Sequence, residues 1–131
     1  MEIAPLKKRR DFLRLRSGKR YSGKYFTLQG TQADVQQKPV RFGLTVTKKT
    51  GNAVVRNRIK RRLRQVASLV LPTKGLRGFD YVVIARRAAL HAEFNEMITQ
   101  LSSALDHIHR TGHKVQAKAK EAERKKDTGN T

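Results

Sequence analysis

The sequence RFGLTVTKKTGNAVVRNRIKRRLRQ, residues 41–65, decides the fold, because a strand, a turn and a helix follow one another in it. Apolar residues alternate between Val40 and Thr47, which predicts a strand with one apolar face and one face of small polar side chains. Lys48 to Gly51 form a basic turn, and Asn52 is a favourable N-cap for a helix. Apolar residues at helical spacing then predict a helix that ends at about Val70, just before a proline.

The rest of the chain adds further elements around this segment. Residues 1–10 begin without a clear pattern. The predicted elements are a short helix from Asp11 to Ser17, a strand from Tyr21 to Gly30, an unbroken apolar strand from Asp80 to Arg86 that suits the centre of a sheet, and a packing helix from Ala89 to about His109. We therefore expect a single α+β domain over residues 1–109, in the order α-β-β-α-β-α, as a small two-layer sandwich. Residues 110–131 contain almost no apolar anchor and are predicted to be a basic tail that is either disordered or a fraying extension of the last helix.

The charge distribution indicates the class of partner. The chain has 30 Lys and Arg against 10 Asp and Glu, a net charge of +20, and no acidic residue between Asp34 and Asp80. Within the central helix, residues 56–64 contain Arg56, Arg58, Lys60, Arg61, Arg62 and Arg64 with no acid at helical spacing. Each like-charge pair at that spacing costs about 0.2–0.5 kcal/mol, which a bound polyanion offsets. Nucleic acid is therefore the expected partner, although composition leaves RNA and DNA open.

The sequence lacks the residues that several classes of function require. There is no cysteine, which excludes disulfides and thiolate chemistry, and no apolar run approaches the ~20 residues of a membrane span. His107, His109 and His113 do not have the spacing of a standard zinc site, and no Ser, His and Asp pattern resembles a triad. We expect no catalytic residue, no metal ligand and no membrane contact in this chain, and a cytoplasmic location.

The motifs resemble those of the bacterial ribonuclease P protein subunit. The resemblance is carried by GNAVVRNRIKRRLRQ with the preceding RFGLTVTKK, by Asp11-Phe12, and by DYVVIARR at residues 80–87. The match covers roughly residues 6–108, with the motifs in the same order and at similar spacing.

The resemblance implies an accessory protein of a ribozyme. The RNA subunit, with Mg²⁺ at its active site, would hydrolyse precursor tRNA to remove the 5′ leader. The protein would bind the ribonuclease P RNA through its arginine-rich helix and the leader in a cleft between the first helix and the sheet. It also implies a mostly antiparallel sheet and a left-handed strand–helix–strand crossover, and no obligate protein partner.

Carried over by position, the resemblance assigns two groups of residues. Contact with the ribozyme RNA is implied for Lys48, Lys49, Gly51, Arg56, Asn57, Arg58, Lys60, Arg61, Arg62 and Arg64. The leader cleft is implied for Phe12, Arg16, Thr27 and Thr45. Family members often have an aromatic residue where this chain has Arg16, so charge would replace stacking there, and Phe12 has core packing as its alternative role.

Two other functions stay open. A structural ribosome-associated RNA-binding protein would have the same charge and the same architecture. A nuclease acting through its own side chains would need a general base or metal ligands.

Overall fold

Residues 3–6, 8–32 and 39–117 are described by the computed structural model, with side chains as far as residue 110. The elements are β1 (Ile3–Pro5), α1 (Arg9–Leu15), β2 (Lys19–Ser22), β3 (Phe26–Gln32), β4 (Val40–Thr45), η1 (Lys48–Thr50), α2 (Ala53–Lys74), β5 (Phe79–Ala85), η2 (Arg87–Leu90) and α3 (Phe94–Ala117), where η marks a 3-10 helix.

The strands form one five-stranded sheet in the order β1-β4-β5-β3-β2. β4 pairs in parallel with both β1 and β5, whereas β3 is antiparallel to both β5 and β2. The predicted α+β class is confirmed. The sheet is evenly mixed rather than mostly antiparallel, because the α2 crossover makes β4 and β5 parallel and the unpredicted β1 adds a second parallel pair.

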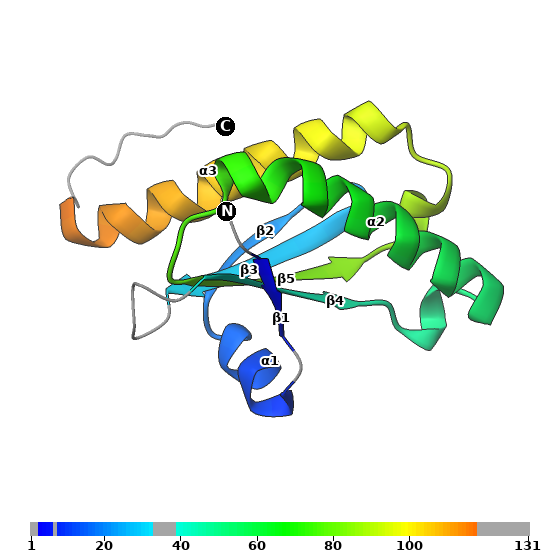
Figure 1. The fold of residues 1–131 in the computed structure, drawn as a ribbon, viewed down its shortest axis with the longest axis horizontal. Coiled ribbons are helices and arrows are strands. Elements are labelled where there is room, and N and C mark those ends of the chain that lie inside the picture. The colour runs from blue at the N-terminus through cyan, green and yellow to red at the C-terminus, as the bar shows by residue number, and fades with distance from the viewer. Residues whose placement is uncertain (1–2, 7, 33–38, 118–131) are drawn as a thin grey trace.

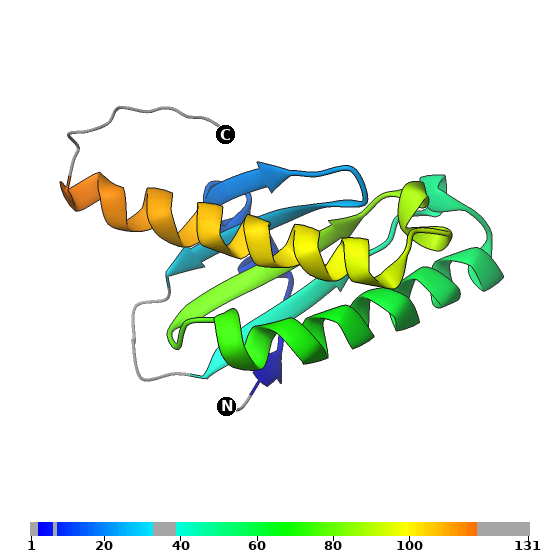
Figure 2. The same ribbon diagram turned by 90° about the horizontal axis from the view of Figure 1, so that it is seen from above.

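The connection from β4 through α2 to β5 is left-handed, as the resemblance implied. In Figure 2 α2 lies in front of the sheet, β4 and β5 both run to the upper right, and β5 lies to the left of β4. A right-handed crossover, which nearly all such units have, would place β5 on the other side of β4.

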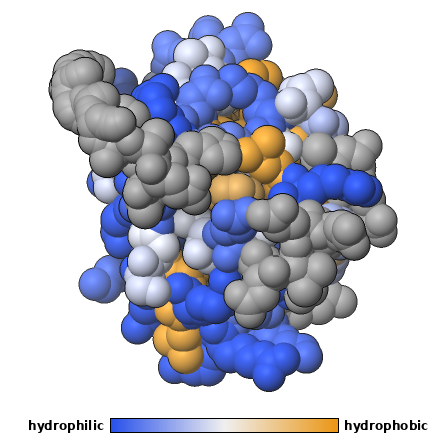
Figure 3. Space-filling view, turned by 90° about the vertical axis from the view of Figure 1, so that its left-hand side faces the viewer, coloured by the Kyte–Doolittle hydropathy of each residue, from blue (hydrophilic) through white to orange (hydrophobic). Residues whose placement is uncertain are grey.

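The helices lie on opposite faces of the sheet. α2 and α3 pack side by side over one face, and α1 lies alone against the other (Figure 1). The main core lies beneath α2 and α3, and the apolar stripes predicted for both helices point into it. Buried members of these stripes are Ile59, Leu63, Val66 and Val70 on α2 and Met97, Leu101, Leu105 and Ile108 on α3. The end of the molecule shown in Figure 3 is mainly hydrophilic, with apolar side chains in small separate patches.

The strand predicted from Tyr21 to Gly30 is instead a hairpin. β2 and β3 are antiparallel, with Ser22 opposite Thr27, and the Gly23 N–H donates to the Phe26 carbonyl at 2.9 Å. The prediction failed to recognise that Gly23-Lys24 could form a turn. Tyr25 lies between the two strands rather than in one of them, and its hydroxyl donates a hydrogen bond to Glu96 on α3.

Both long helices have different limits from those predicted. α2 continues through Pro72 to Lys74, because Leu71 is only 1% exposed and its carbonyl accepts the Gly75 N–H at 2.8 Å. The final helix begins at Phe94 rather than Ala89, since residues 87–90 form η2, and it extends past His109 to Ala117. Residues 118–131 of the predicted tail lie outside the described residues.

Candidate nucleic-acid interface

The turn between β4 and α2 requires a glycine at its last position. Gly51 has a φ of 153°, and a Cβ built there would lie 2.8 Å from Val55 Cγ1 and 2.9 Å from Arg87 Nη1. Arg87 Nη1 donates to the Thr50 carbonyl at 2.8 Å, and Arg56 Nε donates to the Gly51 carbonyl at 3.2 Å. These contacts fix where α2 starts relative to the end of β4. The structure thus gives Gly51 a conformational role, whether or not its backbone touches RNA.

The first turns of α2 present a cationic surface. The predicted N-cap is confirmed, because Asn52 Oδ1 accepts the Val55 N–H at 2.9 Å. In the described parts of the chain, ion pairs engage Arg14, Arg41 and Lys74, and no cation of residues 48–64 has a carboxylate partner. Of the ten predicted contacts in this region, the exposed ones are Lys48, Lys49, Asn57, Arg58, Arg61 and Arg64, and the half-buried ones are Gly51, Arg56, Lys60 and Arg62.

Arg62 differs from its neighbours because it binds the fold. Its Nε donates to the Ala89 carbonyl at 3.2 Å, and its Nη2 donates to the Ala92 carbonyl. Both acceptors lie in or just after η2, where the chain turns from β5 into α3. The side chain therefore ties α2 to this connection, whereas Arg61, the next residue back, is exposed.

A second feature is a cleft between α1 and the open face of the sheet. A cavity of about 380 Å³ is lined by Phe12, Arg16, Arg20, Gln29, Thr45, Val82 and Ile84. Phe12 lies on α1 and Arg16 directly after its end, and four neighbouring strands supply the others. The sheet face is polar here because alternate residues of β3 and β4 point away from the main core, as the sequence predicted for β4.

Phe12 lies directly on the sheet because β4 has a glycine beneath it. A Cβ built on Gly43 would lie 2.8 Å from Phe12 Cζ and 3.1 Å from Leu6 Cβ. Leu6, Leu15 and Val82 form a small buried cluster against which Phe12 is partly buried. The ring thus serves both predicted roles, since it packs on this cluster and also lines the cavity.

The two predicted threonines have different positions. Thr45 lines the cavity, whereas Thr27 is only 3% exposed and its Oγ1 accepts a hydrogen bond from Arg86 at 3.4 Å. Thr27 is opposite Ile84, and Ile84 is opposite Thr45, so all three share the open face. Thr27 lies in the floor beside the cavity rather than on its lining.

Sequence reasoning missed Arg20, Gln29 and Arg86 at this site. Gln29 is two residues beyond Thr27 and only 4% exposed, and among the described residues its side chain has no hydrogen-bond partner. Because alternate residues of a strand share a face, the prediction that Thr27 lies at the cleft could have been extended to Gln29. Arg20 was missed because the hairpin was predicted as a single strand.

The acidic side chains nearest the cleft are engaged by the fold. None of the described residues form a group of three or more His, Asp or Glu side chains able to hold a metal ion. Asp11 and Asp80, the acidic residues nearest the cleft, are both engaged by arginines. No described helix is long and apolar enough to cross a lipid bilayer.

Comparisons with known proteins agree on one family. A family model described as Ribonuclease P matches residues 2–109. The chain is 40% identical over 109 residues to the ribonuclease P protein component of Ruegeria pomeroyi, covering 82% of this chain and 87% of the relative. It is 44% identical over 102 residues to that of Bartonella quintana, covering 74% and 77%.

Solved structures lead to the same family. The RNase P protein from Thermotoga maritima is similar with a TM-score of 0.65 and 31% sequence identity, covering 79% of this chain and 96% of that one. The Staphylococcus aureus RNase P protein is similar with a TM-score of 0.60 and 30% identity, covering 82% and 93%.

Proposed function

The chain belongs to the ribonuclease P protein family, and from this premise we propose that it is the protein subunit of a bacterial ribonuclease P holoenzyme. In this function it binds the catalytic RNA and the 5′ leader of precursor tRNA. The holoenzyme is an endoribonuclease that removes the leader in the cytoplasm. The hydrolysis belongs to the RNA subunit.

The observation that carries the proposal is the cationic surface of the η1 turn and α2. Lys48, Lys49, Arg58, Arg61 and Arg64 are exposed, and no described carboxylate neutralises them. Arginine suits an RNA backbone because its planar guanidinium donates two parallel hydrogen bonds to a phosphate. Hydrogen bonds from Arg56 and Arg87 fix the start of α2 relative to β4, so the backbone that carries these cationic side chains has a fixed position when RNA binds.

The cleft supports a separate site for a single-stranded segment. Its volume of about 380 Å³ admits part of an extended strand and is too small for a duplex. Phe12 offers one ring for base stacking, and Arg16 and Arg20 can pair with phosphates. Gln29 has an amide that can donate to and accept from a base edge.

The distribution of acids supports catalysis by the RNA. A protein general base or metal site would need a free carboxylate or imidazole at the cleft, and its nearest described carboxylates are ion-paired. These residues do not fit a magnesium site, so we expect the RNA subunit to hold the catalytic Mg²⁺. The protein would then reduce the phosphate repulsion between ribozyme and substrate.

A reconstituted cleavage assay tests this function. Precursor tRNA is incubated at low Mg²⁺ with a bacterial ribonuclease P RNA, with the protein, and with both. We expect inert protein, slow RNA, and a mixture that cuts at the mature 5′ end. A mixture no faster than the RNA alone would refute the proposal and favour a ribosome-associated protein. Cleavage by the protein alone would show a nuclease in its own right.

A further inference from the structure

Two acidic residues in the family motifs have no role in binding a polyanion. Asp11 precedes Phe12 in the first motif, and Asp80 begins the strand motif of β5. Asp80 lies on the open face of the sheet and Asp11 on α1 above it, on the side of the molecule where a carboxylate repels RNA phosphates. Asp80 is nevertheless buried, with 1% exposure.

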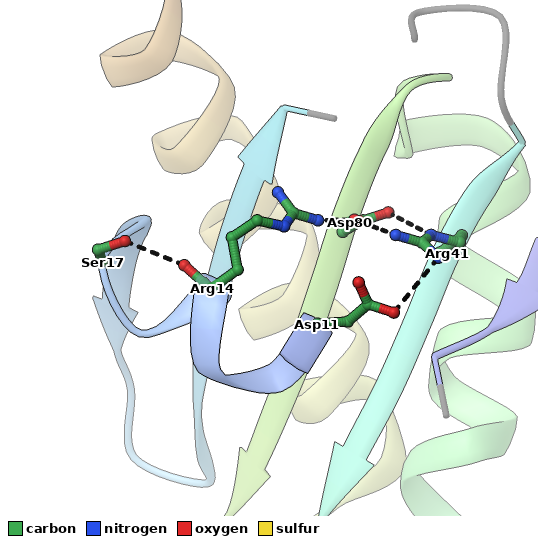
Figure 4. A network of polar contacts seen from close by, with 5 residues as sticks. All are labelled: Asp11, Arg14, Ser17, Arg41 and Asp80. Atoms are coloured by element: carbon green, nitrogen blue, oxygen red, sulfur yellow. Dashed lines mark hydrogen bonds and ion pairs between the residues drawn. The ribbon is translucent and has the colours of Figure 1, made fainter. Parts of the chain in front are cut away.

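Asp80 is the centre of a polar network that joins α1 to the sheet (Figure 4). Arg41 binds it in a bidentate manner, with Nε 2.8 Å from Oδ1 and Nη2 2.7 Å from Oδ2. Arg14 of α1 donates to the same Oδ2. Arg41 Nη1 also lies 3.5 Å from Oδ2 of Asp11 on α1. We call Asp11, Arg14, Arg41 and Asp80 the Asp80 network.

Each charged side chain in this network is paired with one of opposite charge. Hydrogen bonding to Asp80 raises the pKa of Arg41, so Arg41 remains charged. Its side chain is 22% exposed and that of Arg14 is 39% exposed. An unpaired carboxylate at the position of Asp80 would be strongly unfavourable, so Asp80 requires an arginine from α1 or β4 close by.

Few other contacts hold α1 in place. The helix has seven residues, and within it only Leu15 is fully buried. Its N-cap, Lys8, makes no side-chain hydrogen bond to the helix. So short a helix is unstable by itself and depends on tertiary contacts. The Leu6, Leu15 and Val82 cluster and the Asp80 network supply them.

The network is one step along the strands from the cleft. Arg41 is opposite Asp80, and the next outward pair is Gly43 opposite Val82, where Phe12 lies. This step of two residues is about 7 Å. On α1, Asp11 and Arg14 flank Phe12 and precede Arg16, so a shift of α1 at the network moves both cleft residues.

We propose that Asp80 is a positioning residue for the leader cleft: through Arg14 and Arg41 it fixes α1 so that Phe12 and Arg16 stand at the correct distance from the sheet. This inference rests on the proposed function, because it assigns the cleft to the leader. Asp80 and its network act on leader affinity without touching the leader and without changing the binding surface of α2.

The direction of the expected effect separates positioning from charge. Asp80→Asn removes one negative charge, which by electrostatics alone would strengthen RNA binding. Positioning predicts the opposite, a leader-dependent loss of affinity of about tenfold, which corresponds to about 1.4 kcal/mol of lost contact. Asp106→Asn is the matched control. It makes the same charge change in an exposed ion pair between Asp106 on α3 and Lys74 on α2, and both helices lie on the opposite face of the sheet from α1.

The experiment uses the reconstituted holoenzyme and two precursor tRNAs, one with a long leader and one with a single-nucleotide leader. We expect Asp80→Asn to raise KM for the long-leader substrate, with kcat, short-leader KM and ribozyme affinity unchanged. Asp106→Asn should change none of these. In a Phe12→Ala background, Asp80→Asn should have a smaller effect on leader discrimination, because only Arg16 is left to displace. If Asp80→Asn does not fold, Arg14→Gln tests the positioning role instead, because it removes only the hydrogen bond from α1 to Asp80. Arg14→Lys should restore part of the leader discrimination that Arg14→Gln loses.

The two proposals fail in different ways. If the wild-type holoenzyme does not distinguish the two leaders, the assignment of the cleft fails. If it does, and neither Asp80→Asn nor Arg14→Gln reduces the distinction, the positioning role of Asp80 is refuted. An equal loss for both substrates would also refute it, since that result indicates general destabilisation.

Discussion

Replacing Arg61 and Arg62 separately by alanine should have opposite effects on stability and different effects on RNA binding. The two residues are adjacent and carry the same charge. Arg61 is exposed and lies three residues from both Arg58 and Arg64, whereas Arg62 donates to the Ala89 and Ala92 carbonyls. We therefore expect Arg61 to serve the RNA and Arg62 to serve the fold.

The magnitudes follow from these surroundings. Arg61→Ala removes two like-charge pairs, those with Arg58 and Arg64, and should stabilise the free protein by about 0.4–1 kcal/mol. Arg62→Ala removes charge-assisted hydrogen bonds at a half-buried site and should cost about 1–3 kcal/mol. For a domain of this size, each kcal/mol shifts Tm by about 4–8 °C.

Salt dependence gives a separate prediction for the RNA. Each neutralised phosphate contributes about 0.7–0.9 to the slope of log affinity against log salt. Between about 50 and 200 mM salt, the advantage of wild type over Arg61→Ala should therefore shrink by about threefold. Arg62→Ala should retain the wild-type slope.

The assay is titration of labelled ribonuclease P RNA at four salt concentrations, with thermal melts of the same preparations. Equal slopes for wild type and Arg61→Ala would refute the assignment of Arg61 to phosphate contact. A lower slope for Arg62→Ala with unchanged Tm would show that its contacts with the carbonyls do not persist in solution.

The other predictions concern the cleft and α3. Gly43→Ala should cost about 1–3 kcal/mol, because the ring of Phe12, 2.8 Å from the new Cβ, must withdraw; chemical denaturation should show at least half of this cost disappearing in a Phe12→Ala background, and an equal cost in both would contradict the packing. Gln29→Leu should leave stability unchanged or higher and reduce discrimination between leaders that differ at one base, measured by competitive cleavage; unchanged discrimination would exclude base contact by this amide. Burial and nearby Arg110 lower the pKa of His107 below 6.5, so the unfolded chain binds its proton more readily. Stability should accordingly fall as the pH drops through about 6.5, and denaturant titrations from pH 7.5 to 5.5 should show a weaker fall in His107→Gln; an identical fall would assign the pH dependence to other groups.

The sequence predicted best where one physical pattern dominates. The stripe that contains Ile59 and Leu63 can satisfy helical spacing in only one way, and Asn52 before it has the side chain that caps a helix. The polar face of β4 followed from simple alternation, and Thr45 therefore lies in the cleft as expected. The cationic face of α2 followed from the absence of acids in the surrounding sequence.

Predictions failed where tertiary contacts override local signals. Pro72 normally ends a helix, but packing of Leu71 against the core holds one more turn. The three residues of β1 form a strand only because β4 offers a free edge. The contacts of Arg62 were not predictable, because its carbonyl acceptors are 27 and 30 residues away in the chain. The same holds for Asp80, whose partners come from two other elements.

The alternation of β4 also limits how this chain can change over evolutionary time. Arg41, Gly43 and Thr45 face α1 and the cleft, while Phe42 and Leu44 contact the main core. Substitutions on one face leave the other face intact, so the two surfaces can diverge independently. A single-residue insertion or deletion inside the strand exchanges the faces, placing an arginine in the core and a phenylalanine in the cleft. We therefore expect length changes among functional descendants of this sequence to avoid residues 40–45.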